Sequence, residues 1–337
     1  MNRLARTLRI GAMLAALAVA SAAFAQEERE PVSIRVGMQA VGTFSWVVHA
    51  MQYFGIDEDY NLNLEPVTYG TKQATELALR GNETDIVVDD FIGVVLMHQR
   101  DVPVQAVYPY GKAVGGVVVP ANGDIDEITD LEGKTIAAAS LDDKSLLILR
   151  TLTTSEYGFD PQQDGETLQA APWLMEGLME QGEIDAGIPY WHFVSRMTYD
   201  GDFEDLMMVT EMLEQLGLRS DLPFLVLVAR EGADPAAVSR FIEAMVATQE
   251  RMMADPMGGI WQSILDEELY SLPDPAAFPD VRARWEAGLP DGWTDEQIDG
   301  LVTLVDRLVE VAGAEVLGVD SLPRDAYTTE YVPESLQ

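Results

Sequence analysis

The stretch that decides the fold is DLEGKTIAAAS, residues Asp130–Ser140. Its Gly133-Lys134-Thr135 triplet matches the end of a phosphate-binding loop, which also needs a glycine five residues before Gly133 and a helix that begins at the triplet. The residue at that earlier position is Ile128, and residues 135–139 form a short apolar run that is typical of a buried strand. The stretch therefore predicts a tight glycine turn that leads into a strand, and it argues against a nucleotide site.

The chain on both sides of this stretch alternates between strand and helix patterns. In a first unit, strands are predicted at 33–38, 62–69, 85–88 and 102–108, with helices at 44–54, 72–80 and 91–99. In a second unit, strands are predicted at 117–120, 135–139, 167–171, 186–189 and 224–229, with helices at 144–157 and 174–181. Alternation of this kind predicts parallel sheets that are covered by helices on both faces.

The last third of the chain is predicted to be helical. Asp234-Pro235 begins one long helix, and Thr294 with Gln297 forms a capping box before another. These helices have no sheet of their own, so we expect them to cover the first sheet. The chain then crosses between domains twice, near Gly115-Gly116 and near Pro223, and the paired crossings form a hinge. The predicted boundaries are 31–115 and 229–320 for domain I, 116–228 for domain II, and 321–337 for a C-terminal tail.

The N-terminus has the pattern of a secretory signal peptide. Three arginines precede the apolar run 10–20, and Ala23-Phe24-Ala25 is a small-x-small cleavage pattern, so residues 1–25 are predicted to be removed. No later segment is long and apolar enough to span a bilayer. The chain has no cysteine, which excludes a lipid anchor on an N-terminal cysteine, disulfides and cysteine-ligated zinc. We therefore expect a periplasmic protein of a Gram-negative bacterium.

The chain is strongly acidic. Its formal charge is -36, and removing three arginines and no acid with the signal peptide takes this value to -39. Such a charge makes nucleic acid an unsuitable partner, because binding to phosphates requires basic residues. The sequence contains only four lysines, Lys72, Lys112, Lys134 and Lys144. The acids are spread through the predicted helices, which indicates a heavily solvated surface that fits a saline habitat.

Several motifs occur in an order that is typical of one protein family. The strand 117–120 is followed by Leu131-Glu132-Gly133-Lys134, the small-residue strand 135–139 and Ser140. Turns that run from Gly81 to Asp85 and from Gly182 to Asp185 each precede a strand, and the segment 149–160 ends in Tyr-Gly-Phe-Asp. Over residues 32–255 the chain resembles the periplasmic solute-binding proteins of ABC importers. The most similar group handles thiamine pyrimidine precursors, alkanesulfonates and taurine, and nitrate.

The resemblance implies a fold, a set of partners and a ligand class. The fold is an α/β, type II-like periplasmic-binding-protein fold of two domains, each a mainly parallel sheet flanked by helices, with the ligand cleft at the hinge. The expected partners are a small solute and an inner-membrane ABC permease with its ATPase, and the receptor is expected to be a monomer with no cofactor and no metal. The loop after the third strand is often small and neutral in this family. Here it is Asp89-Asp90, which argues against an anionic solute.

Ligand-binding residues are expected at the carboxyl ends of the strands and the N-termini of the helices. The candidates are Thr43, Phe44, Ser45, Tyr69, Asp89, Asp90, Tyr110, Ser140, Asp142, Lys144, Trp173, Tyr190, Trp191 and His192. The aromatic residues among them can stack on a flat ligand, while Asp89 or Asp90 accepts hydrogen bonds or balances a cation. The alternative is that Thr71 and Asp142 or Asp143 are helix caps and that the aromatic residues belong to the core.

The hypothesis is therefore a receptor for a flat, nitrogen-containing solute such as a thiamine-type pyrimidine. The alternatives are a receptor for a sulfonate, nitrate or another oxyanion, a sensor partner, and a periplasmic enzyme of the pyrimidine-precursor synthase type. The three histidines, His49, His98 and His192, are not paired at metal-ligand spacing, and no Gly-x-Ser-x-Gly motif is present. The prediction is that the protein is not an enzyme.

Overall fold

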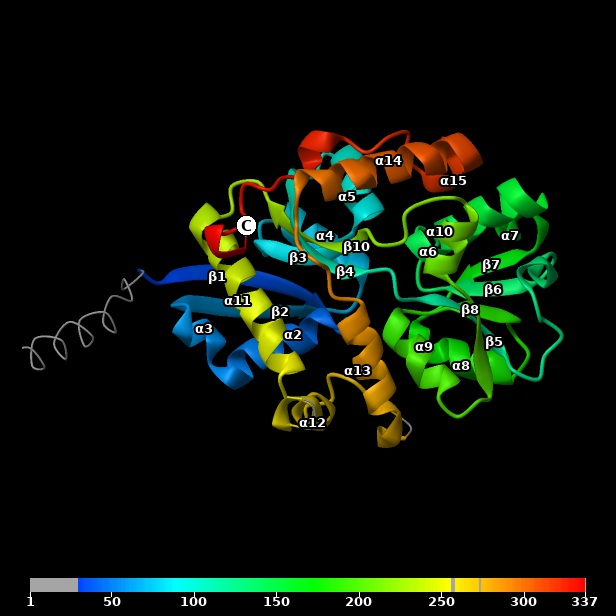
Figure 1. Ribbon diagram of the computed structural model, residues 1–337, viewed down its shortest axis with the longest axis horizontal. Coiled ribbons are helices and arrows are strands. Elements are labelled where there is room, and N and C mark those ends of the chain that lie inside the picture. Colours follow the sequence, from blue (N-terminus) through cyan, green and yellow to red (C-terminus); the bar gives the residue numbers. More distant parts are fainter. Residues whose placement is uncertain (1–29, 256–257, 273, 337) are drawn as a thin grey trace, which may run out of the picture.

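The computed structural model describes residues 30–255, 258–272 and 274–336. The predicted signal peptide, residues 1–25, lies outside the described residues. The described chain forms two lobes that lie side by side, and each lobe contains one five-stranded sheet with helices around it (Figure 1). The two-domain α/β prediction is therefore confirmed.

The first sheet has the strand order β2-β1-β3-β10-β4. Its strands are β1 (Val32–Gln39), β2 (Leu62–Tyr69), β3 (Ile86–Asp90), β4 (Val104–Lys112) and β10 (Pro223–Arg230). β1 pairs in parallel with β2 and β3, while β10 runs antiparallel to both β3 and β4. Four of the five strands therefore run in one direction, as the sequence predicts for a mainly parallel sheet.

The second sheet repeats this arrangement with the strand order β7-β6-β8-β5-β9. Its strands are β5 (Gly116–Pro120), β6 (Thr135–Ala138), β7 (Glu166–Gln169), β8 (Ala186–Ile188) and β9 (Phe203–Met208). Here β5 is the single strand of opposite direction. Strand β9 has no counterpart among the predicted elements, because its acidic, half-exposed sequence FEDLMM lacks an apolar run.

The position of β10 corrects the predicted domain boundary. Residues up to 228 were expected in the second domain, but β10 lies between β3 and β4 in the first sheet, with Leu225 opposite Asp90. The chain therefore returns to the first lobe before Pro223, as the predicted hinge crossing requires, and the boundary at 228 and 229 is wrong. The reason is that an apolar strand fits the interior of either sheet, and only long-range pairing decides between them.

The five helices predicted for the two lobes begin at or within two residues of their predicted starts, and four further short helices of the described residues were not predicted. The first lobe contains α2 (Phe44–Phe54), α3 (Ile56–Asp59), α4 (Lys72–Arg80) and α5 (Phe91–Gln99). The second contains α6 (Lys144–Leu152), α7 (Pro161–Asp164), α8 (Pro172–Glu180), α9 (Trp191–Thr198) and α10 (Val209–Gln215). The predicted helix 144–157 changes at Thr153 into a π-helical turn. The stretch quoted above forms a turn at Gly133, with φ +75°, and then the buried strand β6.

In each sheet, an aspartate just before a central strand accepts a hydrogen bond from the backbone of the neighbouring strand. Asp85, just before β3, accepts a hydrogen bond from Arg35 N at 2.9 Å, and Asp185, just before β8, accepts one from Thr135 N at 2.8 Å. The carboxylate of Asp85 also accepts hydrogen bonds from the guanidinium groups of Arg35 and Arg230. These carboxylates satisfy backbone donors that no neighbouring strand reaches, so the two turns from glycine to aspartate set the register of the strands.

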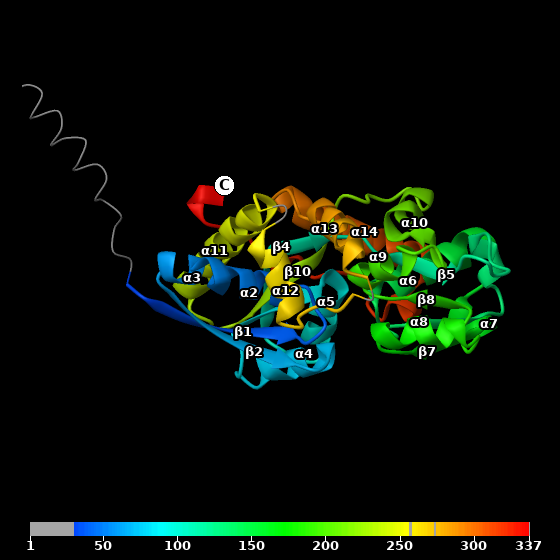
Figure 2. The same ribbon diagram turned by 90° about the horizontal axis from the view of Figure 1, so that it is seen from below.

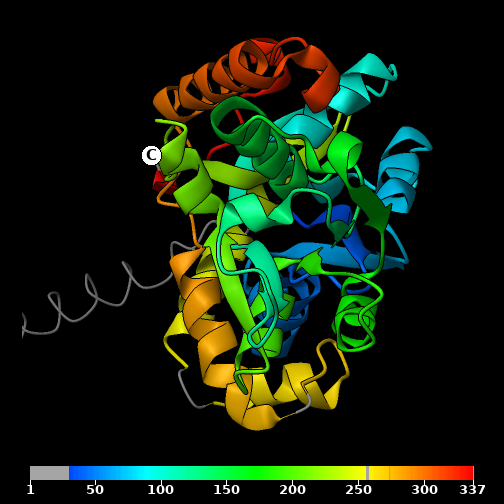
Figure 3. The ribbon, with the colours of Figure 1, turned by 90° about the vertical axis from the view of Figure 1, so that its right-hand side faces the viewer.

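The C-terminal helices contact both lobes. They are α11 (Pro235–Met253), α12 (Gly259–Asp266), α13 (Phe278–Ala287), α14 (Asp295–Ala312) and α15 (Ala314–Leu317). α11 covers the first sheet as predicted, but α13 packs against α9 and α14 against α6, both in the second lobe (Figure 2). Seen from the second lobe, the orange-red α14 and the yellow-orange α12 and α13 lie on opposite sides of the green strands (Figure 3). Helices α13 and α14 therefore pack on two different helices of the second lobe, α9 and α6.

The segment after residue 320 also belongs to the first lobe. Tyr327 is buried, forms a bridge with Ala106 of β4, and donates its hydroxyl to the carbonyl of Phe91. Within the described residues, no helix combines the length and apolar character that a membrane span requires.

Candidate functional site

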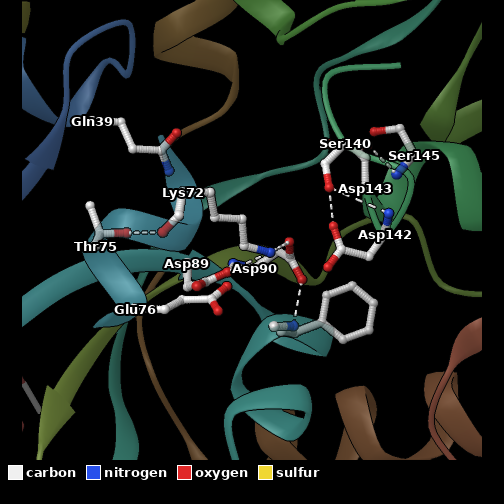
Figure 4. Close-up of polar contacts among 12 residues, drawn as sticks. Gln39, Lys72, Thr75, Glu76, Asp89, Asp90, Ser140, Asp142, Asp143 and Ser145 are labelled. Carbon is white, nitrogen blue, oxygen red and sulfur yellow. Dashed lines mark hydrogen bonds and ion pairs between the residues drawn. The ribbon is translucent and has the colours of Figure 1, made fainter. Parts of the chain in front are cut away.

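A cavity opens between the lobes, at the carboxyl ends of the central strands. Ten of the predicted ligand-binding residues line it: Thr43, Phe44, Asp89, Asp90, Tyr110, Ser140, Lys144, Tyr190, Trp191 and His192. The close-up in Figure 4 shows Lys72, Asp89 and Asp90 of the first lobe on one side and the loop from Ser140 to Ser145 of the second lobe on the other. Both lobes thus contribute polar and aromatic side chains to one space.

The first lobe supplies an aromatic wall. The rings of Phe44 and Tyr110 meet edge to face with centroids 5.3 Å apart, and the hydroxyl groups of Tyr110 and Thr43 lie 3.3 Å apart. Burial raises the pKa of Tyr110, so its hydroxyl stays protonated. This wall presents flat apolar surface together with hydroxyl groups.

A buried charge cluster lies beside this wall. Lys72 Nζ is 2.9 Å from Asp89 Oδ1 and 2.8 Å from Asp90 Oδ2. Asp90 caps α5, because its Oδ1 accepts from Gly93 N at 2.7 Å, and Asp90 N donates to Asp89 Oδ1 at 2.7 Å. The second oxygen of Asp89, Oδ2, is buried and has no hydrogen-bond partner among the described residues. Three of the four carboxylate oxygens of Asp89 and Asp90 therefore have hydrogen-bond or ion-pair partners within the protein, and Asp89 Oδ2 has none among the described residues.

Burial and charge act in opposite directions on these groups. Burial raises the pKa of Asp89 to about 7, only partly opposed by the ammonium group of Lys72. Burial also acts to raise the pKa of Asp90, but Lys72 and Lys144 hold it below its usual range. Burial alone would lower the pKa of Lys72, yet the two carboxylates raise it well above its ordinary value. Lys72 is therefore a permanent cation, and Asp89 is the member of the cluster that exchanges a proton near neutral pH.

The second lobe faces this cluster with the start of α6 and the start of α9. Asp143 caps α6 by accepting from Ser145 N at 2.8 Å, and both residues line the cavity next to Lys144. Lys144 forms no ion pair with any described residue. From the start of α9, Tyr190 donates its hydroxyl to Gln39 Oε1 of the first lobe at 3.3 Å. The lobes are therefore already in contact across the cavity.

His192 joins the lobes at the back of the cavity. Its Nε2 lies 2.9 Å from the carbonyl oxygen of Val41, so Nε2 carries the proton and donates it. Tyr270, from the C-terminal part of the first lobe, donates to the backbone oxygen of His192 at 2.6 Å. Nδ1 of His192 is then an acceptor, and it is buried without a partner in the part of the chain that the structure describes. Burial lowers the pKa of His192 to about 3, so the ring is neutral.

His192 should make the protein sensitive to mild acid. In the unfolded chain the ring binds a proton below about pH 6.5, whereas the folded chain resists protonation until about pH 3. Stability is thus full above pH 6.5 and is lost as the pH falls, by about 2 kcal/mol from this group at pH 5. Urea unfolding at pH 7.5 and pH 5 should show a smaller fall for His192→Gln than for the natural protein. An equal fall in both would contradict this assignment.

Four predicted site residues do not line the cavity. Ser45 donates to the Gly42 carbonyl at 2.7 Å within the first turn of α2. Tyr69 ends β2, which is an edge strand of the sheet. Asp142 pairs with the Ser140 hydroxyl, and Asp143 lines the cavity instead. Trp173, in the first turn of α8, is 49% exposed. Ser45, Tyr69 and Asp142 lie within three residues of a lining residue in the sequence, whereas Trp173 lies 16 residues from the nearest one, Pro189.

Five polar residues that line the cavity are not among the residues predicted from the sequence: Gln39, Lys72, Lys112, Asp143 and Ser145. Three of the four lysines in the chain, Lys72, Lys112 and Lys144, line this one space. The scarcity of lysine was the signal that could have found them, because a residue type that the surface avoids is retained where it is needed. Two of the helix caps that the sequence analysis gave as an alternative are present in the structure: Thr71 caps α4 and Asp143 caps α6. The described residues contain no group of three or more histidine, aspartate or glutamate side chains that could hold a metal ion.

Comparison with known proteins places this geometry in a family. The protein-family model described as "NMT1/THI5 like" matches residues 49–258, which is more than half of the chain. The chain belongs to the NMT1/THI5-like family. No curated protein matches the sequence.

Solved structures agree with this family fold at low sequence identity. The alkanesulfonate-binding protein SsuA from Xanthomonas axonopodis pv. citri, bound to MOPS, is 19% identical with a TM-score of 0.68, over 89% of this chain and 99% of that one. The periplasmic nitrate-binding protein NrtA from Synechocystis PCC 6803 is 12% identical with a TM-score of 0.62, over 90% and 92%. The periplasmic aliphatic sulphonate binding protein SsuA from Escherichia coli is 17% identical with a TM-score of 0.58, over 85% and 97%. At these identities the likeness concerns the fold of this NMT1/THI5-like protein.

Proposed function

We propose that this protein is the extracytoplasmic receptor of an ABC importer and that it closes its lobes on a small, flat solute with N–H donors. The observation that carries the solute class is a pair of buried acceptors on two residues that line the cavity, Asp89 Oδ2 and His192 Nδ1, which lack hydrogen-bond partners among the described residues. A buried acceptor without a donor costs about 1–3 kcal/mol, so a solute that supplies donors recovers this free energy.

The two acceptors belong to different lobes, which links binding to closure. Asp89 is the second-last residue of β3 in the first lobe, and His192 lies in the first turn of α9 in the second. A solute that contacts both stabilises the closed form over the open one, and a permease can respond to that difference. The rings of Phe44, Tyr110 and Trp191 supply the flat surfaces on which such a solute stacks.

The wider role follows from the family and from the signal-peptide pattern. The similar solved structures described above are binding proteins, which supports a receptor in place of an enzyme. We infer that the chain is exported to the periplasm, acts there as a monomer, and delivers its solute to an inner-membrane permease with its ATPase. A thiamine-type pyrimidine fits the flat, N–H-bearing class.

An oxyanion is the second candidate, because three lysines line the cavity. Lys72 is held by two carboxylates, and Lys112 lies 3.4 Å from Asp291, so Lys144 is the ammonium group most available to a sulfonate or nitrate. Asp143, which lines the cavity beside Lys144, opposes an anion there. Three lysines and three aspartates line the cavity, so the preference for an N–H-bearing solute rests on the two unpaired acceptors and not on the net charge.

The test is native mass spectrometry of the protein purified from its own periplasm, followed by release and identification of any bound molecule. A flat heterocycle with N–H groups is the expected result. A bound sulfonate or nitrate would keep the receptor role and overturn the solute class. A protein that carries no solute and binds none from a periplasmic extract would overturn the receptor role.

Replacing Trp191 by Ala should weaken binding of the released solute by about tenfold or more, since stacking on an aromatic ring contributes about 0.5–1.5 kcal/mol beyond area burial. Trp191 is only partly buried, and its ring packs edge to face on Trp46 at 6.1 Å, so the fold should persist. Calorimetric titration measures the dissociation constant, and thermal unfolding monitors the fold. An unchanged dissociation constant would remove Trp191 from the site.

A further inference from the structure

Helix α9 belongs to the second lobe but is bonded to the first lobe along its length. At its start, Tyr190 and His192 make the hydrogen bonds across the cavity that are described above. Tyr270 donates to the His192 carbonyl at 2.6 Å, and Arg196, one turn further along α9, donates to the Ser271 carbonyl at 3.2 Å. The segment between α12 and α13 therefore holds α9 from the side opposite β1.

Aromatic rings fill the space around these hydrogen bonds. The ring of Trp46, on α2 of the first lobe, has its centroid 5.0 Å from that of Tyr270, 5.6 Å from that of His192 and 6.1 Å from that of Trp191. Trp46, Tyr270 and His192 are all buried. Moving α9 away from the first lobe would expose these rings and break the hydrogen bonds among them, so it costs free energy.

Helix α13 adds a second connection, across the hinge. Nη1 of Arg284 donates to the Val114 carbonyl at 3.2 Å, in the crossing between β4 and β5, and Nη2 donates to Asp205 Oδ2 of β9 at 3.0 Å. The C-terminal end of α13 is fixed to the first lobe, because Lys112 N donates to the Gly288 carbonyl at 2.7 Å. A guanidinium group that is carried by the first lobe therefore holds both the hinge strand and β9 of the second lobe.

We propose that the contacts of α9 with Trp46 and Tyr270, together with those of Arg284, form a latch that keeps the receptor mostly closed before a solute arrives. Each latch contact joins one part of the protein to another, so it stabilises the closed form whether or not the cavity holds a solute. Opening of the lobes requires the latch to break, and a solute enters through a minor open population. This inference deepens the proposed receptor function, because it concerns how the same two lobes close, and it rests on that function.

The latch predicts a distinctive change in binding rates. Weakening it raises the open population of the empty protein, which speeds association, and destabilises the closed complex by the same factor, which speeds dissociation. The dissociation constant then changes little, because both effects cancel while the closed form still dominates. A residue that only supported the cavity wall would weaken binding instead.

The test measures the separation of the lobes in the full mature chain. The chain has no cysteine, so cysteines introduced at Leu77 of α4 and Leu174 of α8, which are 65% and 52% exposed, can be spin-labelled selectively. Pulsed electron paramagnetic resonance of the natural protein, freed of solute by unfolding and refolding, should give mainly the distance of the closed form. Tyr270→Phe and Arg284→Met should each raise the ratio of open to closed protein by about fivefold, the effect of losing about one hydrogen bond.

Two variants are matched controls and should leave the distances unchanged. Tyr157→Phe removes a hydroxyl group that bonds to Gln215 within the second lobe, and Arg282→Met removes a guanidinium group that pairs with Glu286 within α13. The molecule that copurifies with the protein, followed by native mass spectrometry after dilution, should leave Tyr270→Phe about fivefold faster than the natural protein. An empty natural protein that is mainly open, or latch variants that behave like their controls, would overturn the latch while the receptor role stands. A natural protein that binds no molecule would overturn the receptor role, whatever the distances show.

Discussion

Replacing Lys72 by Met is expected to lower the free energy of unfolding by about 3–5 kcal/mol, the usual cost of removing one partner from a buried ion pair. The loss arises because Asp89 and Asp90 would remain buried next to each other without a cation. Methionine has a similar length and apolar stem, so the change in volume contributes little. Urea unfolding of the two proteins at pH 8 measures the difference.

The pH dependence of this loss has a definite sign. Without Lys72, the pKa values of both carboxylates rise in the folded state above the unfolded value, so stability decreases as the pH rises through the folded pKa. The deficit of Lys72→Met should therefore be smaller at pH 5 than at pH 8. The double variant Lys72→Met/Asp89→Asn should recover part of the stability at pH 8, because it removes one of the two repelling charges.

Lys112→Met provides the matched control. Lys112 also lines the cavity, but its partner Asp291 has a side chain that is 85% exposed and lies 3.4 Å away. Exposed pairs of this kind contribute about 0–1 kcal/mol, so the control should lose little stability. Equal losses in Lys72→Met and Lys112→Met would show that the buried cluster is not the cause.

Replacing Asp85 by Asn is expected to cost about 3 kcal/mol, because hydrogen bonds to charged groups contribute about 1.5–3 kcal/mol each. Asp85 accepts from the guanidinium groups of Arg35 and Arg230 at 2.7–3.1 Å, and so ties β1 and β10 to the start of β3. Asp185→Asn removes the equivalent charge in the second lobe, where the aspartate accepts from Thr135 N, and should cost about 1 kcal/mol. Denaturant midpoints of the two variants give the comparison, and similar losses would contradict the role of the arginines.

Asp85 also contributes to the acid stability of the first lobe. Burial would raise the pKa of Asp85, but hydrogen bonds from Arg35 and Arg230 lower it to about 2. A carboxyl group with a depressed pKa contributes stability above its unfolded value of 3.8, and that contribution is lost as the pH falls from 3.8 to 2. Asp85→Asn should therefore be less sensitive than the natural protein to a change from pH 4 to pH 2.

Local patterns located most of the candidate site but could not select its members. The rule that ligands bind where parallel strands end and helices begin found Thr43, Asp89, Ser140 and Tyr190, since β-to-α junctions are visible as changes of hydrophobic period. It did not separate Asp142 from Asp143, because neighbouring residues in a loop differ only in the direction of their side chains. Lys72 was missed for a related reason: it is the first residue of α4, one position past the candidate loop, and its long side chain carries the ammonium group away from its own backbone to Asp89 and Asp90.

The sequence by itself determined the order of most strands and helices, with β9 and α9 among the exceptions, the caps at Asp234 and Thr294, and the turn at Gly133, because these features depend on residues a few positions apart. Only the tertiary structure decided that β10 pairs with β3 and β4, that the C-terminal helices hold both lobes, and that Lys72 meets two carboxylates. The physical reason is range. Propensity and periodicity act within one element, whereas strand pairing and the placement of buried charges depend on contacts between segments far apart in the chain, which the folded packing alone brings together.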